Sequence, residues 1–165
     1  MASKRRDPRS STSSTISPLL DGVNLKLLRE LQLDPRLPMA KLARRLRMSP
    51  PAVAERVQRL REAGVITGFR LELDPGALGL PVTAYVRVRP GPGQLTRVAE
   101  LAQKTVEVIE CHRITGEDCF LIKVHVAEVN KIEVILDRFL AYGQTTTSIV
   151  QSSPVPLRAL PLPRV

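Results

Sequence analysis

One short stretch of the sequence, residues 49–63, gathers polar side chains of the kind that bind nucleic acids. Ser49 is a typical helix N-cap residue, and the two prolines after it suit a first helical turn, which needs no amide hydrogen. Val53, Val57 and Leu60 recur at helical spacing and predict the buried face. The opposite face carries Pro51, Glu55, Gln58 and Arg59, with Arg56 at its border. Arginine and amide groups bind phosphate oxygens and base edges, so this face is a candidate for DNA contact.

The positive charge of the chain is concentrated in its N-terminal part. Residues 1–68 hold 14 Lys and Arg against 6 Asp and Glu, whereas residues 69–165 hold 11 against 10. Basic clusters bind phosphate backbones mainly by releasing counterions, so this asymmetry favours a polyanion-binding half joined to a neutral half of another purpose. A basic surface that merely keeps the protein soluble is the alternative.

The cysteines, histidines and acidic residues give no sign of catalysis. Cys111 and Cys119 fall on opposite faces of a predicted hairpin, so they cannot form a disulfide within one chain, and we expect both to be buried as small apolar groups. His112 and His125 lie on the same hairpin without a third metal ligand nearby. No nucleophile elbow, phosphate-binding loop or pair of catalytic carboxylates is visible in the sequence. We therefore predict no catalytic residue, no metal site and no cofactor, and an enzyme is the weaker class of function.

Two shorter helices precede the polar stretch and must position it. In the first, Asp21 is a candidate N-cap, and Asp34 marks the end just before a proline. In the second, residues 38–46, apolar residues recur at helical spacing and leave basic ones toward solvent. Only two residues separate this helix from Ser49. The tight link predicts a helix-turn-helix whose third helix enters the major groove; an ordinary three-helix bundle with a solvated charged face remains the alternative.

From Ile66 onward the pattern changes to strands and helices in alternation. Residues 66–74 alternate like a strand, and "PGALGLP" at residues 75–81 predicts a hinge. The order that follows is strand, helix, hairpin, helix, strand, at residues 82–89, 94–103, 106–115 with 119–127, 129–143 and 144–151. This βαββαβ order predicts a ferredoxin-like α+β domain with both helices on one sheet face. The other face of the sheet is left uncovered by the helices. We expect another protein surface to cover it, and a second copy of the chain is the simplest candidate.

These boundaries divide the chain into five parts. We predict a disordered basic arm at residues 1–18, a helix-turn-helix domain at 19–68, a linker strand and hinge at 69–81, a βαββαβ domain at 82–153 and a Pro-rich tail at 154–165. The sequence shows no signal-peptide core and no membrane-spanning run, so we expect a soluble cytoplasmic protein.

Three motifs occur in a specific order: "LDGVN", "SPPAVAERVQRLREAGVI" and "ECHRITGEDCFLIKV". Together they resemble the Lrp/AsnC (feast/famine) family of transcriptional regulators, over about residues 20–156. The resemblance implies an N-terminal winged helix-turn-helix that binds double-stranded DNA and a C-terminal βαββαβ domain, called a RAM domain, that binds small effectors, usually amino acids. It also implies homodimers that assemble further into octamers, and a nucleoid-associated protein.

The predicted helix-turn-helix places DNA contacts along the third helix and at the turn before it. The expected DNA-binding residues are Arg47, Ser49, Pro51, Glu55, Arg56, Gln58 and Arg59. Arg47 stands where the family turn often carries glycine, so we expect a positive φ at this position. The chain also departs from the family pattern at Asn24 and Cys119, which replace aspartates, and at Pro38, which replaces a capping serine.

The family's effector site lies between associated subunits. In this chain the hairpin turn offers backbone amides at Gly116 and beyond and carboxylates at Glu117 and Asp118. Hydroxyl groups come from the last strand, at Thr145, Thr146 and Thr147. Amides and hydroxyls bind a carboxylate and acidic side chains bind an ammonium group, so these residues are a candidate amino-acid site. The alternative is an ordinary tight hairpin turn followed by threonines that only favour a strand.

Two other functions remain open. A ligand-binding metabolic sensor or enzyme would use only the βαββαβ domain and would leave the basic helices without a role. A βαββαβ sheet can also bind single-stranded RNA by stacking bases on exposed aromatic side chains. The chain has few aromatic residues, which disfavours this mode: Phe69, Tyr85, Phe120, Phe139 and Tyr142.

Overall fold

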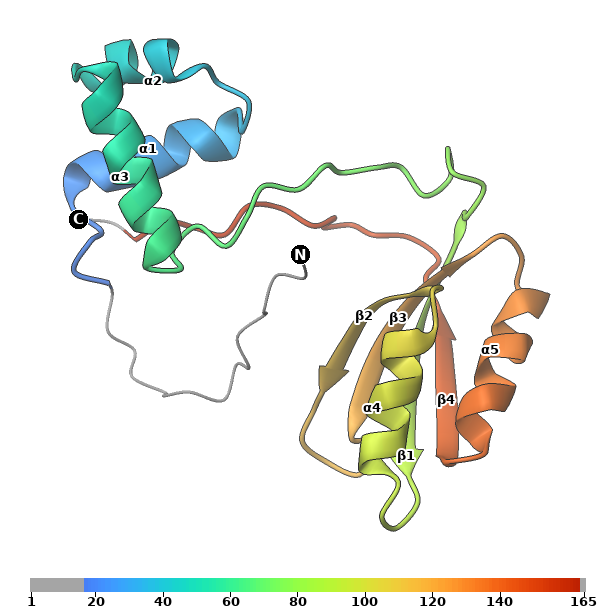
Figure 1. Cartoon of the computed structure of the whole chain (residues 1–165). Helices are drawn as coiled ribbons and strands as arrows, with labels where there is room; N and C mark the ends of the chain where they lie inside the picture. The colour runs from blue at the N-terminus through green and yellow to red at the C-terminus, as the bar shows by residue number, and fades with distance from the viewer. Residues whose placement is uncertain (1–16, 164–165) are drawn as a thin grey trace. The chain divides into compact units, whose positions relative to one another are not determined.

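Two hydrophobic cores divide the chain into two units (Figure 1). The computed structural model describes residues 17–163. The helical unit comprises the N-terminal residues as far as Arg70 together with the C-terminal residues from Leu157, and the sheet unit comprises Leu71–Pro156. The predicted basic arm at residues 1–18 lies almost entirely outside the described residues.

The helical unit contains α1 (Gly22–Leu33), α2 (Met39–Leu46) and α3 (Pro50–Glu62), at the positions that the sequence predicts. Asp21 caps α1, and its carboxylate accepts a hydrogen bond of 2.6 Å from the amide of Asn24. Burying one large apolar side chain stabilises a fold by about 1.5–3 kcal/mol, more than a cap does, so packing decides which helix faces turn inward. The core consists of Leu27, Leu28, Leu31, Leu37, Leu42, Ala43, Leu46, Val53, Val57 and Leu60.

The turn between α2 and α3 contains one strained residue. Arg47 ends α2 with φ 55° and ψ 45°, the positive φ predicted for it. Among residues 17–163 it is the one residue other than glycine with a positive φ. A side chain in this left-handed conformation costs about 1 kcal/mol. The cost is offset by helix termination, because the amide of Met48 donates a 3.0 Å hydrogen bond to the carbonyl of Ala43.

The sheet unit has the predicted βαββαβ order. Its elements are β1 (Val82–Pro90), α4 (Leu95–Lys104), β2 (Val108–Arg113), β3 (Phe120–Val126), α5 (Asn130–Leu140) and β4 (Gly143–Ile149). The strands form one antiparallel sheet in the order β2-β3-β1-β4, and both helices cover the same face (Figure 1). This is the expected ferredoxin-like α+β arrangement. Within residues 17–163, no helix has the length and apolar character needed to cross a membrane.

Alternation along the strands decides which side chains reach the sheet core. On β1, Ala84, Val86 and Val88 face the helices and are buried. The same core contains Val98, Ala102, Phe120, Ile122, Val124, Val126, Ile132, Ile135 and Phe139. The intervening residues of β1 and β3 point to the other face, which neither α4 nor α5 covers. We call this surface the open sheet face; it carries Tyr85, Arg87, Arg89, Leu121, Lys123 and His125.

The strand predicted at residues 66–74, which leads into the linker assigned to residues 69–81, is not formed. Residues 67–74 pair with no strand among residues 17–163. A strand needs a neighbour for its amides and carbonyls, and sequence alternation does not say whether the same chain supplies one. Phe69, Leu71 and Leu73 are therefore exposed, at 51%, 83% and 58%.

The prediction that both cysteines are buried is wrong. Cys111 is exposed and Cys119 is partly exposed. Their expected separation onto opposite faces is not confirmed: Cys111 is paired with Ile122 on the helix-covered side, and Cys119, just before the start of β3, packs against the core on that side. Cys111 is exposed because it lies on β2, an edge strand. This strand has a neighbouring strand on one side only and is exposed along most of its length.

The Pro-rich tail predicted at residues 154–165 is not a part of its own. From Leu157 onward it groups with the helical unit. The side-chain amide of Gln32, at the end of α1, donates a 3.0 Å hydrogen bond to the carbonyl of Leu160. This contact joins positions 128 residues apart, so no local pattern in the sequence signals it.

Replacing Arg47 by glycine should make the helical unit more stable. Arg47→Gly should raise the free energy of unfolding by up to about 1 kcal/mol, because glycine adopts the left-handed conformation without a steric penalty. The matched control is Arg44→Gly, the same chemical change at an exposed helical position of α2, which should lower stability by about 1 kcal/mol. Urea unfolding of the full chain measures both. Equal destabilisation by the two variants would show that Arg47 is unstrained.

Candidate nucleic-acid interface and effector site

The polar face of α3 is exposed as predicted. Val53, Val57 and Leu60 are buried in the helical core, so the opposite residues Pro51, Glu55, Gln58 and Arg59 point to solvent. Ser49 begins the helix, with its hydroxyl 3.4 Å from the amide of Ala52. The structure thus brings six of the seven predicted DNA-binding residues to exposed positions on α3 or in the turn before it: Arg47, Ser49, Pro51, Glu55, Gln58 and Arg59.

The exposed side chains of α3 are paired with one another. Arg59 Nη2 lies 2.6 Å from Glu55 Oε1, with about two thirds of each side chain exposed at 66% and 63%. Gln58 Nε2 donates a 2.7 Å hydrogen bond to Glu62 Oε1. Exposed pairs spaced by one helical turn contribute only about 0.3–0.5 kcal/mol. A phosphate or a base edge can therefore replace these partners at little cost.

Arg56 differs from its neighbours because its guanidinium is held within the helical unit. Arg56 Nη1 donates 3.0 Å hydrogen bonds to Asp21 Oδ2 and to Asn24 Oδ1. Asn24 is 6% exposed, and its side-chain amide donates a 2.6 Å hydrogen bond to the carbonyl of Leu19. The geometry favours a positioning role in which Arg56 fastens the middle of α3 to the start of α1. The sequence placed Arg56 only at the border of the polar face and gave no sign of this partner.

Asp21 serves this contact and the helix cap at once. One of its oxygens accepts the amide of Asn24, and the other accepts Arg56. The hydrogen bond from the Asn24 amide, reinforced by the Arg56 guanidinium, lowers the pKa of Asp21 below its usual value of 3.8. The carboxylate is therefore charged in the folded protein throughout the neutral and mildly acidic range.

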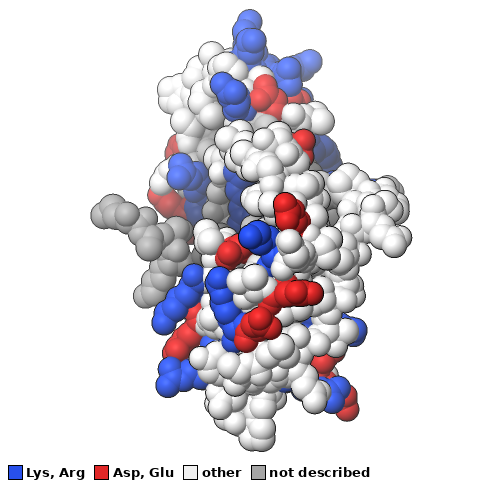
Figure 2. Space-filling view, turned by 90° about the vertical axis from the view of Figure 1, so that its right-hand side faces the viewer, with Lys and Arg blue, Asp and Glu red and all other residues white. Residues whose placement is uncertain are grey.

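α2 adds further basic side chains next to α3, against which it packs. Lys41, Arg44 and Arg45 are exposed, and Arg45 forms an ion pair with Glu30 of α1. Cations at such positions bind phosphates without regard to base sequence. On the face drawn in Figure 2, basic and acidic side chains lie next to one another in several patches.

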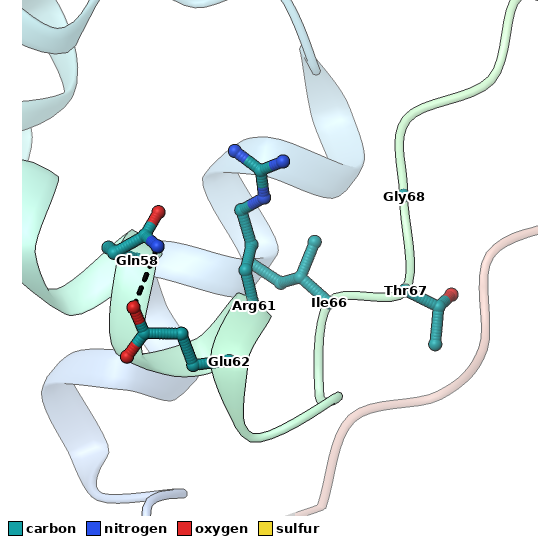
Figure 3. A pocket seen from close by; sticks show the side chains of 6 residues that line it. All are labelled: Gln58, Arg61, Glu62, Ile66, Thr67 and Gly68. Carbon is teal, nitrogen blue, oxygen red and sulfur yellow. Dashed lines mark hydrogen bonds between the residues drawn. The ribbon is translucent and has the colours of Figure 1, made fainter. Parts of the chain in front are cut away.

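A shallow hollow lies at the C-terminal end of α3 (Figure 3). It is lined by Gln58, Arg61, Glu62, Ile66, Thr67 and Gly68, and the bond between Gln58 and Glu62 crosses one side of it. The lining is mainly polar and open to solvent, and it contains none of the residues predicted to bind an effector. Gln58 is the one predicted DNA-binding residue on its wall.

The predicted effector turn lies beside the end of β1. Gly116 has a φ of 111°, and the amide of Cys119 donates a 2.9 Å hydrogen bond to the carbonyl of Val88. Two arginines of β1 meet the acidic residues of the turn: Arg89 pairs with Glu117, and Arg87 Nη1 lies 3.5 Å from Asp118 Oδ2. The alternation in β1 puts these arginines on the open sheet face, a signal that the sequence contained and the prediction did not use.

The three predicted threonines of β4 do not converge on one ligand. Thr146 is paired with Arg87, so it points to the open sheet face beside the effector turn. Thr145 and Thr147 are paired with the buried residues Val88 and Val86 and point to the helix-covered side. Thr147 Oγ1 is buried without a hydrogen-bond partner among the described residues. Side chains alternate along a strand, so three consecutive hydroxyls cannot share a face.

The two histidines bind neighbours on the sheet rather than each other. His125 Nδ1 lies 2.9 Å from Thr83 Oγ1, and burial lowers the pKa of His125, helped by the charge of Lys123. His112 Nε2 lies 3.6 Å from Glu110. Within the described part of the chain, no group of three or more His, Cys, Asp or Glu side chains is arranged to hold a metal ion.

Comparison with known proteins identifies both units. Residues 20–67 match the winged helix-turn-helix DNA-binding family, and residues 83–160 match the Lrp/AsnC ligand binding domain. The chain is 33% identical over 133 residues to the HTH-type transcriptional regulator LrpC of Bacillus subtilis, a match that covers 81% of this chain and 92% of that protein. The chain belongs to the Lrp/AsnC family of transcriptional regulators. The family and fold predicted from the three motifs are thereby confirmed: a winged helix-turn-helix DNA-binding domain joined to an effector domain.

Other transcriptional regulators resemble this chain along most of its length. The solved structure of B. subtilis LrpC superimposes with a TM-score of 0.77 over 81% of this chain and 96% of that chain. A regulator from Neisseria meningitidis, solved as a complex with L-Met, gives a TM-score of 0.78 at 26% identity, over 86% and 96% of the two chains. LrpA of Mycobacterium tuberculosis is 32% identical over 129 residues, or 78% of this chain and 86% of that protein. These relatives are named as transcriptional regulators and not as enzymes.

Removing the Asp21 carboxylate should destabilise the winged helix-turn-helix domain in a pH-dependent way. Asp21→Ala should lower the free energy of unfolding at pH 7 by about 1 kcal/mol, the usual contribution of an N-cap. Because folding lowers the pKa of Asp21 below 3.8, its contribution is fully present above pH 4 and is lost as the pH falls through the lowered pKa, so the difference between the two proteins should shrink as the pH falls below 4. Urea unfolding between pH 3 and 7 measures this difference, with Glu72→Ala in the exposed linker as control. A pH-independent difference would contradict the assignment.

Proposed function

We propose that this regulator binds double-stranded DNA as a homodimer that places α3 of each subunit in the major groove, and that an amino acid bound at the open sheet face alters this binding. The observation that carries the proposal is the exposed polar face of α3. Arg56 fastens this helix to the start of α1, and the basic residues of α2 lie beside it. A DNA-binding regulator works in the cytoplasm, on the nucleoid, and we place the protein there.

Ser49 and Pro51 lie at the N-terminal end of α3, which in a helix-turn-helix approaches the base edges most closely. Glu55, Gln58 and Arg59 follow along the same face, and Arg59 gains a guanine edge or a phosphate when it leaves Glu55. Arg47 offers a further phosphate contact from the turn. We assign Arg56 to positioning, because contact with DNA would cost it two hydrogen bonds to α1.

The homodimer is supported by two surfaces that the described chain leaves without a partner. Phe69, Leu71 and Leu73 alternate along a linker whose backbone groups pair with no strand in residues 17–163. The open sheet face carries exposed Tyr85 and partly exposed Leu121. In a two-fold symmetric dimer, each of these surfaces would be covered by the second copy, and both subunits would make the same contacts. Two α3 helices then meet half-sites about 34 Å apart, or a multiple of this distance. Assembly of dimers into an octamer would extend the same principle.

The amino-acid effector is supported by the charges around the hairpin turn. Arg87 and Arg89 can bind a carboxylate, with Thr146 as a hydroxyl donor beside them. Glu117 and Asp118 can bind the ammonium group once the effector replaces them on the arginines, and the amides from Gly116 onward offer further donors. The L-Met complex of the N. meningitidis relative is consistent with an effector of this class. Thr145 and Thr147 then serve packing and not binding.

The positions of the aromatic side chains give little support to RNA binding. Phe120 and Phe139 are buried in the sheet core, at 3% and 1% exposed, and cannot stack on bases. Tyr85 alone lies on the open sheet face, where Lys123 Nζ sits 5.9 Å from the centre of its ring. One aromatic side chain does not form the platform of stacked bases that this mode requires.

Truncating Arg59 should weaken DNA binding without loss of folding. Arg59→Ala should reduce affinity for a selected duplex by about 1–3 kcal/mol if Arg59 binds guanine. Arg97→Ala is the matched control, because Arg97 is equally exposed, at 66%, and is paired with Glu100 along α4 of the effector domain. Fluorescence anisotropy with labelled duplexes measures both affinities. If the two variants bind alike, Arg59 is not a DNA contact.

The strand register predicts which threonine binds the effector. In calorimetric titrations with the twenty amino acids, at least one should bind the wild-type protein, and Thr146→Val should weaken that binding about tenfold or more by removing one hydrogen bond to a charged group. Thr145→Val changes the same group one position away and should leave binding unchanged. Thr147→Val should also bind normally and be more stable, because it removes an unpaired buried hydroxyl.

Two results would count against this effector site. The first is that none of the amino acids binds the wild-type regulator. The second is that Thr145→Val weakens binding as much as Thr146→Val, since the two side chains point to opposite faces of the sheet.

A further inference from the structure

The C-terminal segment of the chain returns to the DNA-binding domain. Residues from Leu157 onward group with the helical unit and not with the effector domain that precedes them. The segment is fixed at one point by the hydrogen bond from Gln32 to the carbonyl of Leu160. Two residues later, Leu162 packs against the core of the helical unit.

The contact is selective among the leucines of the segment. Leu157 and Leu160 leave 85% and 79% of their surface exposed, whereas Leu162 is partly buried. Leu162 joins the partly buried residues that rim the same core, namely Leu19 and Leu20 before α1, Met48 before α3, and Val65 and Ile66 after it. A chance collapse of an apolar tail would not distinguish Leu162 from Leu160 in this way.

The sequence around Leu162 suits an extended docking segment. Pro161 and Pro163 flank it and fix the backbone φ near −65°, which lowers the entropy lost when the segment becomes ordered. Because prolines have no amide hydrogen, the backbone offers mainly carbonyls, and the Leu160 carbonyl is the one bound by Gln32. The helical unit therefore contacts this segment in two ways. It packs against an apolar side chain that lies between two prolines, and it donates one hydrogen bond to a backbone carbonyl.

We propose that the winged helix-turn-helix domain carries a docking surface for an extended Leu/Pro segment, and that its occupant is residues 157–163 of the same chain. The match to the winged helix-turn-helix family ends at residue 67, and residues 157–160 lie at the end of the match to the Lrp/AsnC ligand binding domain, so the contact joins parts of the sequence that belong to two different family matches. The domain is complete only when the C-terminus is docked.

The docked segment gives the two domains a second connection, which is covalent at β4 and noncovalent at the helical core. The first is the linker before β1, and the second is residues 150–156, between the end of β4 and Leu157. Seven residues span at most about 25 Å when fully extended. A movement of the effector domain beyond this reach must release Leu162 from the DNA-binding domain.

Hydrogen exchange in the full-length protein tests this docking. Leu162→Ala, and a chain that ends after Pro156, should exchange the amides of α1 about fivefold faster than wild type, because each loses apolar contact with the helical core. Leu157→Ala and Leu160→Ala remove the same atoms from exposed positions and should exchange like wild type. Gln32→Ala should give a smaller acceleration by removing one hydrogen bond.

A peptide added in trans separates docking from general destabilisation. A synthetic peptide of residues 153–165 should restore slow exchange to the chain that ends after Pro156, and the same peptide with Leu162→Ala should not. Equal exchange in wild type and the shortened chain would overturn the proposal, as would equal acceleration by Leu157→Ala and Leu162→Ala. These outcomes do not depend on DNA or effector, so they stand apart from the test of the proposed function.

Discussion

The guanidinium of Arg56 joins the middle of α3 to the first turn of α1, and this contact fixes the face of α3 that remains exposed. Val53, Val57 and Leu60 bury one side of the helix, but apolar packing is non-directional and tolerates small rotations. Two hydrogen bonds, to Asp21 and Asn24, are directional and set the rotation. Asp21 also caps α1, so one carboxylate sets the start of one helix and the orientation of another. The polar face of α3 depends on this pair.

A second constraint organises the effector domain in the same way. Because strand side chains alternate, each position of the sheet belongs either to the helix-covered core or to the open sheet face. Arg87, Arg89 and Thr146 fall on the open face together with the hairpin turn, whereas Thr145 and Thr147 fall on the other. The carboxylates of the turn are already held by arginines in the described chain. Under the proposed function, an amino-acid effector would exchange one set of ionic contacts for another at this site.

Local sequence patterns predicted the helices and strands of both domains and the residues at which several of the helices begin. The caps at Asp21 and Ser49 were predicted because each depends on a few neighbouring residues, and the positive φ of Arg47 was predicted from the glycine that the family often has at this turn. Contacts between residues far apart in the sequence were not predicted. Neither the partner of Arg56 nor the docking of Leu162 leaves a periodic signal, and the unpaired linker needs a strand that the described chain does not contain. The separation of the threonines could have been predicted, since alternation alone decides it.

The central claim, that two α3 helices of a dimer read DNA together, is tested most directly by selecting binding sites from a random duplex library with the full-length protein. The account predicts that the recovered sequences contain two related half-sites in inverted orientation, with centres about 10 base pairs or a multiple apart. Recovery of sequences with no common motif, or of single motifs without a fixed spacing, would contradict it. Either result would mean that the basic charge of the N-terminal half binds phosphates without presenting paired reading helices.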